Sequence, residues 1–216
     1  MKQQAYYEDL FKRGDESIWE SAPGKTVVVN AIRHFTKTGR IPHDARIVDI
    51  GCGTGVLLER IRNEVPGNAF ELFGLDFSRE AITKAVRVRR GIRFACRDGT
   101  RTGLEDSSAD VVVSYGAYEH FHSPEDGIRE LSRILKASGL FFCMMPALGI
   151  DRTDRDDEGW YEERPVPGSP IRQMQHNLKR GTWENMFRAC GLSLFPAEDA
   201  AAFGALKPGV FFFGFK

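Results

Sequence analysis

A glycine-rich turn between a strand and a helix constrains the fold of this chain more than any other feature. Residues 47–50 are rich in β-branched side chains and lead directly into Gly51, Gly53 and Gly55. β-Branched residues are typical of a central parallel strand, and glycines permit a tight turn with positive φ close to a ligand. The helix predicted from Val56 directs its free N–H groups at that turn. The pattern predicts an open α/β sheet with a ligand over the carboxyl ends of its strands.

The spacing of the glycines bears on the kind of ligand. A dinucleotide turn reads G-x-G-x-x-G/A, whereas this turn reads G-x-G-x-G and has Val56 where the third small residue belongs. Asp49, two residues before the first glycine, would repel a pyrophosphate but suits a cationic ligand that resembles an amino acid. A nicotinamide-dependent oxidoreductase stays open as an alternative that these two residues disfavour.

The stretch from Val48 to Gly55 resembles the first motif of the class I S-adenosylmethionine-dependent methyltransferases at every position. The resemblance, which is to the small-molecule group of that family, implies S-adenosylmethionine as the cofactor. It also implies a Rossmann-like, doubly wound, seven-stranded α/β sheet that is mostly parallel with an antiparallel last strand. Sequence motifs carry the resemblance over about residues 45–146. In the rest of the chain only the order of the predicted helices and strands is similar. The cofactor-binding candidates in this motif are Asp49, Gly51, Cys52, Gly53 and Gly55.

The second predicted strand, residues 70–76, ends in an acid. Asp76 lies about 20 residues after Gly55, the place where an acid holds the hydroxyl groups of a ribose. In the methyltransferase family the acid at this place binds the ribose of the cofactor. Gly74 to Ser78 match that motif, so Phe77 is also a cofactor-binding candidate.

A third strand is predicted over residues 92–97 and ends at Asp98 and Gly99. In the family an acid at this place holds the adenine amino group, which makes both residues cofactor-binding candidates. An Asp-Gly pair is also a common turn, so a purely structural role for Asp98 stays open.

The fourth strand is predicted over residues 110–115, which are strongly β-branched. Its end should face the methyl group, because this strand adjoins the first strand where the strand order reverses. Ser114 and Tyr115 are therefore the last cofactor-binding candidates on the sheet.

Histidines after the fourth strand are the candidate catalytic bases. His120 and His122, next to Glu119, resemble the fourth motif of the small-molecule methyltransferases. Histidine has the pKa needed to take a proton from an acceptor at neutral pH. The same residues could instead pack the loop or hold the amino-acid end of the cofactor. His176 is an independent candidate base.

Two regions lie outside the motifs of what we expect to be one domain, residues 1–216. Residues 1–23 carry Tyr7 and Trp19, which we interpret as cofactor-binding aromatics of a lid, although a helix simply docked on the domain fits equally well. Residues 147–180 are too long for a plain connection. We interpret them as a substrate-cap insert, with a surface loop as the alternative.

The composition limits the partners. Lys plus Arg total 30, as do Asp plus Glu, so no net charge favours nucleic acid or an anionic membrane. No apolar run approaches the length of a membrane span, and the N-terminus lacks a signal-peptide core. We expect a cytoplasmic protein with neither partner. We expect no metal either, although Glu119, His120 and His122 include zinc-type donors.

The sequence therefore predicts S-adenosylmethionine-dependent methyl transfer to a small-molecule acceptor, with oxygen as the favoured atom. A methyltransferase-fold protein that binds the cofactor without transferring a methyl group is the main alternative. A nucleic-acid acceptor is disfavoured, because the segment from Ser114 to Ala117 lacks the Asn/Asp-Pro-Pro-aromatic motif of amino-methylating nucleic-acid enzymes. The sequence specifies neither the acceptor nor the oligomeric state.

Overall fold

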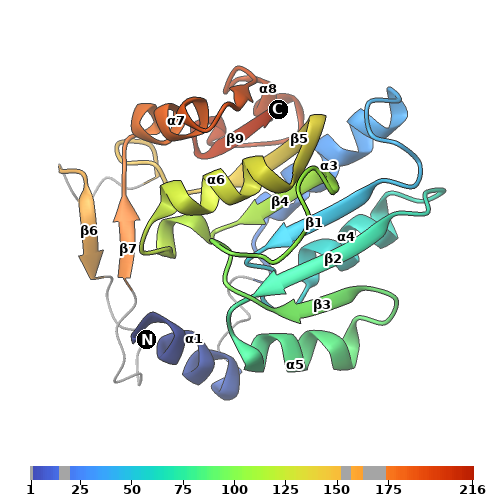
Figure 1. The fold of residues 1–216 in the computed structure, drawn as a ribbon. Coiled ribbons are helices and arrows are strands. Elements are labelled where there is room, and N and C mark those ends of the chain that lie inside the picture. The colour runs from blue at the N-terminus through green and yellow to red at the C-terminus, as the bar shows by residue number, and fades with distance from the viewer. Residues whose placement is uncertain (1, 15–19, 152–156, 163–173) are drawn as a thin grey trace.

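The computed structural model describes residues 2–14, 20–151, 157–162 and 174–216, and its centre is a seven-stranded sheet (Figure 1). The strand order is β3-β2-β1-β4-β5-β9-β8. The strands β1 to β5 are parallel, and β9 is antiparallel to both of its neighbours. This is the predicted Rossmann-like sheet, and its order reverses between β1 and β4. The strands are β1 (Arg46–Ile50), β2 (Glu71–Asp76), β3 (Arg93–Cys96), β4 (Ala109–Tyr115), β5 (Leu135–Met144), β8 (Ser193–Leu194) and β9 (Phe211–Phe215).

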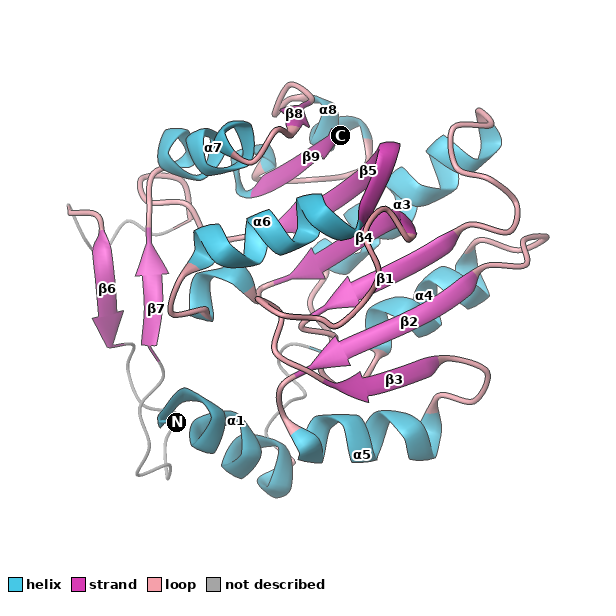
Figure 2. Ribbon diagram, in the orientation of Figure 1, coloured by secondary structure: helices cyan, strands magenta, loops and turns pink. Residues whose placement is uncertain are grey.

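Helices cover both faces of the sheet (Figure 2). The side chains of β1 alternate between the two layers: Ile47 belongs to one buried cluster, and Val48 and Ile50 belong to the other. The first cluster includes α3 and α4, and the second includes α6 and α7. These helices are α3 (Gly24–Lys37), α4 (Val56–Glu64), α6 (Pro124–Ile134) and α7 (Arg180–Ala189).

Helix α7 is held on the sheet by aromatic side chains. Phe187 stacks on Phe141 of β5 with ring centroids 5.0 Å apart, and Trp183 is fully buried. The indole N–H of Trp183 donates to the carbonyl of Pro146 at 3.0 Å, so its polar atom is satisfied. Trp183 and Phe187 are therefore core residues.

Three elements border the carboxyl ends of the strands (Figure 1). Helix α1 (Lys2–Arg13) packs against α5 (Arg79–Val88), which lies at the β3 edge of the sheet. The strands β6 (Gly159–Glu162) and β7 (Met174–Asn177) form a separate antiparallel pair inside the region interpreted as an insert. This pair was not predicted.

The remaining differences from the sequence prediction are local. The strand β5 begins at Leu135, directly after α6, and bulges before it pairs with β4 again at Leu140. Ser138 in that bulge has a φ of 63°. Three short helical elements were not predicted: η1 (Tyr118–His120), α8 (Asp199–Ala202) and η2 (Pro208–Val210). Among the described helices, none is long and apolar enough to cross a membrane.

Candidate cofactor and acceptor site

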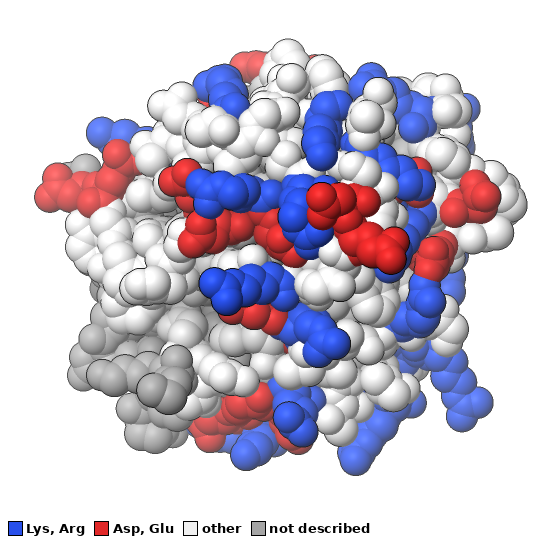
Figure 3. Space-filling model, viewed as in Figure 1, with Lys and Arg blue, Asp and Glu red and all other residues white. Residues whose placement is uncertain are grey.

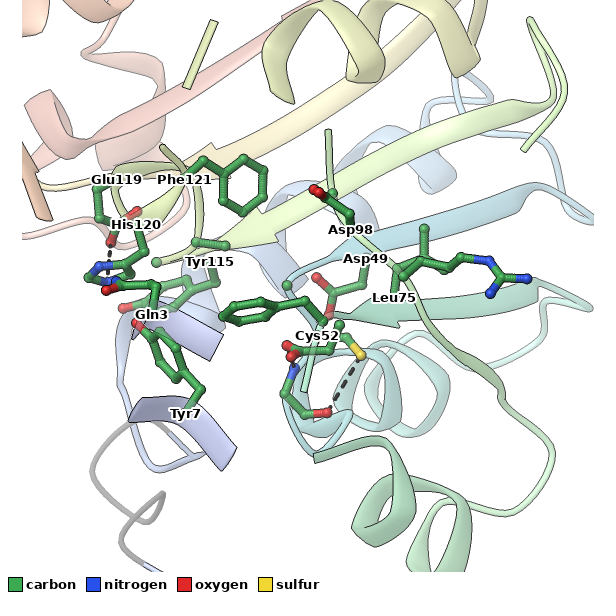
Figure 4. Close-up of a pocket in the computed structure, with 18 of the residues that line it drawn as sticks. Gln3, Tyr7, Asp49, Cys52, Leu75, Asp98, Tyr115, Glu119, His120 and Phe121 are labelled. Atoms are coloured by element: carbon green, nitrogen blue, oxygen red, sulfur yellow. Dashed lines mark hydrogen bonds and ion pairs between the residues drawn. The ribbon is translucent and has the colours of Figure 1, made fainter. Parts of the chain in front are cut away.

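A cavity of about 810 Å³ lies at the carboxyl ends of the central strands (Figure 4). Most of the candidates chosen from the sequence line it: Tyr7, Asp49, Gly51, Cys52, Gly53, Asp76, Phe77, Asp98, Gly99, Tyr115, His120 and His122. Figure 4 shows Asp49, Cys52 and Asp98 toward one end and Tyr7, Glu119 and His120 toward the other, with Tyr115 between them. The predicted cofactor residues and the predicted bases therefore share one cavity.

The glycine turn forms the floor of this cavity. Gly51, Gly53 and Gly55 have φ values of 78°, 53° and 80°, a region that other residues rarely adopt. A Cβ on Gly51 would collide with the side chain of Ala117, and one on Gly55 would lie 2.5 Å from the ring of Phe94. A Cβ on Gly53, by contrast, would meet only the ring of a residue in α1, at 3.6 Å. The backbone at Gly53 is thus open to a ligand.

Asp76 is held at the end of β2 by the backbone. Its carboxylate accepts hydrogen bonds from the amides of Gly53 and Ser78, both at 2.9 Å. Burial raises the pKa of Asp76 to about 6, and these backbone hydrogen bonds oppose the rise. The side chain joins the glycine turn to the second strand end, which is where the sequence predicts a ribose.

Asp49 and Lys25 form a buried pair of opposite charge in the same cavity. Asp49 is 2% exposed, and its Oδ1 has no hydrogen-bond partner among the described residues. Burial raises the pKa of Asp49 to about 7, although Lys25 lowers it. Burial likewise lowers the pKa of Lys25 to about 8, although Asp49 and Glu20 raise it. A bound cation next to Asp49 and an anion next to Lys25 would offset the cost of burying each group.

Lys25 was not among the sequence candidates. It lies in the first turn of α3, 8% exposed, with its ammonium 4.7 Å from the centroid of the Tyr115 ring. Burial raises the pKa of Tyr115 to about 12, so its hydroxyl stays protonated at neutral pH. A Cβ on Gly24 would collide with that hydroxyl, so the small residue at the helix start lets α3 approach Tyr115.

At the end of the third strand, Asp98 stabilises the turn that follows it by hydrogen bonds. One carboxylate oxygen accepts hydrogen bonds from the amide and the hydroxyl of Thr100, both at 2.8 Å. The structural role left open by the sequence is therefore present, and the exposed side chain of Asp98 also lines the cavity. Gly99 packs against the ring of Phe121, where a Cβ would lie 2.5 Å from a ring carbon.

Two cofactor-binding candidates do not line the cavity. The hydroxyl of Ser114 is fully buried and donates to the carbonyl of Ile50 at 2.8 Å, so it joins β4 to β1. Successive residues of a strand face opposite sides of the sheet, and here the side chain of Tyr115 lines the cavity. Gly55 is needed for the turn and the packing of Phe94, not for ligand contact. These two predictions are corrected accordingly.

Cys52 lies in the turn but is not prepared to act as a nucleophile. Burial raises the pKa of its thiol well above the ordinary value, and the carboxylates of Asp76 and Asp49 raise it further. The thiol therefore stays protonated at neutral pH, which agrees with a packing or ligand-contact role.

His120 is the histidine best placed for catalysis. Its side chain is 11% exposed, and its Nδ1 lies 3.0 Å from the carbonyl oxygen of Met174 in β7. Its Nε2 lies 3.7 Å from Oε1 of Glu119, which is 3% exposed (Figure 4). His122 also lines the cavity, with its ring 6.3 Å from that of Trp160.

His176 lies elsewhere. Its ring packs on Trp160 with centroids 4.2 Å apart, and its Nε2 lies 3.1 Å from the carbonyl oxygen of Phe121. The preceding residue on β7, Gln175, lines the cavity instead. Burial lowers the pKa of His176. The prediction that His176 is a base is therefore corrected: it fastens β7 to the segment after β4.

Of the two N-terminal aromatic candidates, the structure describes Tyr7. Tyr7 lines the cavity, and its ring contacts the rings of Phe77 and His120 with centroids 5.4 Å and 5.7 Å apart. Trp19 lies outside the described residues.

The geometry agrees with what comparison with known proteins finds. Residues 48–143 match the model of a methyltransferase domain family, and these residues contain the glycine turn, both strand-end acids and the histidine segment. Residues 48–143 are therefore a methyltransferase domain, and the sheet order and the curated relatives agree with a class I S-adenosylmethionine-dependent methyltransferase. The cofactor that this family implies is S-adenosylmethionine.

Relatives of this methyltransferase act on different acceptors. It is 29% identical over 129 residues to the ubiquinone biosynthesis O-methyltransferase of Maricaulis maris, covering 56% of this chain and 47% of that protein. It is 29% identical over 147 residues to a Bacillus subtilis protein provisionally named as a 23S rRNA (guanine-N(1)-)-methyltransferase, covering 66% of this chain and 48% of that protein. The chain therefore spans about half the length of these curated relatives.

A solved structure covers more of the chain. The 1,6-didemethyltoxoflavin-N1-methyltransferase of Burkholderia thailandensis, solved with its acceptor and S-adenosylhomocysteine, superposes with a TM-score of 0.65. It is 14% identical and covers 99% of this chain and 85% of that protein, so the likeness shows a shared fold.

The cavity of this methyltransferase fits its cofactor. Oδ1 of Asp49, without a partner among the described residues, is a suitable acceptor for the α-ammonium group. Lys25 is a suitable partner for the α-carboxylate, and Asp76 can accept from ribose hydroxyls beside the open backbone of Gly53. The one signal for Lys25 in the sequence is its position directly after Pro23 and Gly24, a helix start aimed at the first strand.

Proposed function

We propose that this methyltransferase transfers a methyl group from S-adenosylmethionine to a hydroxyl group of a small-molecule acceptor, with His120 as the general base. The observation that carries the proposal is the pair His120 and Glu119, whose side chains are 11% and 3% exposed and line the same cavity as the ribose candidate Asp76. A neutral hydroxyl is a weak nucleophile and needs a base for its proton, which a histidine can supply at neutral pH.

The bound cofactor would supply a methyl carbon attached to a positively charged sulfur. The bond between that carbon and the sulfur would break as the carbon joins the acceptor oxygen, and the sulfur would keep the electron pair. The chain has three tasks around that reaction. Asp49, Lys25 and Asp76 hold the cofactor in one orientation. His120 takes the hydroxyl proton on Nε2, and Glu119 stabilises the imidazolium that results. The proton is later released to water, and the products are the methyl ether and S-adenosylhomocysteine.

The charge of the cavity supports a small-molecule acceptor over a nucleic acid. Among the described residues that line it, acids outnumber bases: Glu20, Asp49, Asp76, Asp98, Glu119 and Asp126 against Lys25 and Arg97. On the face drawn in Figure 3, Lys and Arg are interspersed with Asp and Glu. A nucleic-acid enzyme needs a basic surface that follows the phosphates, because phosphate contacts supply most of the affinity.

The cavity is bordered by α1 and β7, and we assign both to acceptor enclosure. Gln3, Tyr7 and Gln175 line the cavity from these two elements. The proposed lid is thus α1, and the described part of the proposed substrate cap is the β6–β7 pair. Enclosure of this kind excludes water from the reacting groups.

A transfer assay tests the proposed function. The protein is incubated with S-adenosylmethionine carrying a labelled methyl group and a panel of phenols, quinols, carboxylic acids and ribosomal RNA transcripts. We expect label in a phenol or a quinol. Label in carboxylic acids alone would contradict the proposal, because a carboxylate has no proton for His120 to take at neutral pH. His120→Ala should lower kcat by about 100- to 10,000-fold, the usual contribution of a general base, whereas His43→Ala in an exposed loop should not. Label in RNA alone would contradict the proposal.

A further inference from the structure

The backbone of a single residue, Met174, joins three separate parts of the chain. The side-chain amide of Gln3 in α1 donates to the Met174 carbonyl at 2.7 Å and accepts from the Met174 N–H at 3.0 Å. The same carbonyl oxygen lies 3.0 Å from Nδ1 of His120 in η1. Gln3 is 171 positions from Met174 in the chain. Its side-chain amide makes the two hydrogen bonds that the backbone of a neighbouring strand would make to Met174.

This arrangement determines which nitrogen of His120 carries the proton. A carbonyl oxygen only accepts hydrogen bonds, so Nδ1 of His120 must be the donor. In the neutral imidazole the lone pair is then on Nε2, the nitrogen 3.7 Å from Glu119. The tautomer that the proposed reaction needs is therefore selected by the position of the Met174 carbonyl.

We propose that Gln3 is a positioning residue for His120 that acts through the Met174 peptide: docking of α1 fixes the Nδ1–H tautomer and leaves Nε2 to receive the acceptor proton. The inference rests on the proposed function for the use made of Nε2. The geometry of the Gln3, Met174 and His120 contacts does not depend on it.

Helix α1 also makes hydrogen bonds close to the cofactor-binding candidate Asp76. Glu8 of α1 accepts hydrogen bonds from the first two backbone amides of α5, which lie three and four residues after Asp76. Between the two anchors, the Tyr7 ring contacts both Phe77 and His120. One rigid helix therefore contacts the ribose turn at one anchor and orders the base at the other, so the base is ordered when the lid is in place.

Nitrogen NMR on protein labelled at its five histidines tests this inference. The His120 signals are assigned with His120→Gln, and the tautomer is read from the ¹⁵N shifts and ring-proton couplings at a pH where the imidazole is neutral. The wild type should show Nδ1–H. Gln3→Met removes the donor and the acceptor together at similar volume, and the Nε2–H form should then become the major one. Gln4→Met is the matched control, because Gln4 is the neighbouring residue and donates to Phe77 instead.

The outcomes separate this inference from the proposed function. Nε2–H in the wild type, or an unchanged tautomer in Gln3→Met, would overturn the inference. A change in Gln4→Met as large as that in Gln3→Met would also overturn it, because the effect would then be a general loosening of α1. Thermal unfolding of each variant verifies that the domain is intact. Failure of methyl transfer with the expected NMR result would reject the proposed chemistry and leave the positioning role of Gln3 in place.

Discussion

The carboxylate of Glu8 lies 2.7 Å from the amide nitrogen of Arg79, so the N-terminus of α5 is capped by a residue of a different helix. The other carboxylate oxygen accepts from the amide of Glu80 at 3.0 Å and from the hydroxyl of Ser78 at 3.1 Å. The first N–H groups of a helix have no partner within it and carry a partial positive charge. Glu8 satisfies two of them and so fastens α1 beside the turn that carries Asp76.

Removing this cap should loosen α1 without unfolding the domain. Capping carboxylates contribute about 1–2 kcal/mol, so Glu8→Ala should speed hydrogen exchange of the α1 amides about 5- to 30-fold. Asp9→Ala is the control, because Asp9 is the next residue of the helix and pairs with Arg13 within α1 at 3.2 Å. Equal exchange rates in the two variants would show that Glu8 does not anchor the helix.

Lys25 should recognise the amino-acid end of the cofactor. Loss of a charged hydrogen-bond partner costs about 1.5–3 kcal/mol, so Lys25→Met should weaken S-adenosylhomocysteine binding about 10- to 100-fold. Binding of 5′-methylthioadenosine, which lacks that end, should be nearly unchanged. Lys37→Met, at the exposed end of the same helix, serves as the control. An equal loss for both ligands would place Lys25 outside the carboxylate site.

Cofactor affinity should rise with pH across the titration of the two buried acids. The pKa values of Asp76 and Asp49 are raised to about 6 and about 7, so both carboxyls are neutral in acid and ionise as the pH increases. The ionised forms accept from the ligand ammonium and hydroxyl groups, so binding of S-adenosylhomocysteine should strengthen through this range. Calorimetric titrations at several pH values measure the effect. Asp49→Asn should lose the upper part of the rise, and a flat profile in the wild type would contradict the assignment.

The parts of the fold and site predicted correctly from the sequence depend on local patterns. The segment from Val48 to Gly55 specifies a strand, a turn and a helix in consecutive residues, and Asp76 follows at a spacing that a βαβ unit fixes. For one physical reason, Ser114 and His176 do not line the cavity. Neighbouring strand residues face opposite sides, so Ser114 and His176 point away from the cavity that Tyr115 and Gln175 line.

The contacts that could not be predicted join residues far apart in the chain. Gln3 and Met174 are 171 positions apart, and Glu8 and Arg79 are 71 positions apart. Neither pair belongs to a motif, and each depends on how α1 docks on the rest of the domain. The tautomer of His120 follows from such a contact and is therefore a property of the tertiary structure alone.

The most direct test of the account is calorimetric titration of S-adenosylhomocysteine into the wild type, Asp76→Ala and the exposed-loop control Asp44→Ala. The account predicts saturable binding to the wild type and to Asp44→Ala. It predicts binding about 10- to 100-fold weaker to Asp76→Ala, because a charge-assisted hydrogen bond worth about 1.5–3 kcal/mol is lost. Absence of binding to the wild type, or equal affinity in all three proteins, would contradict the assignment of the cavity to the cofactor.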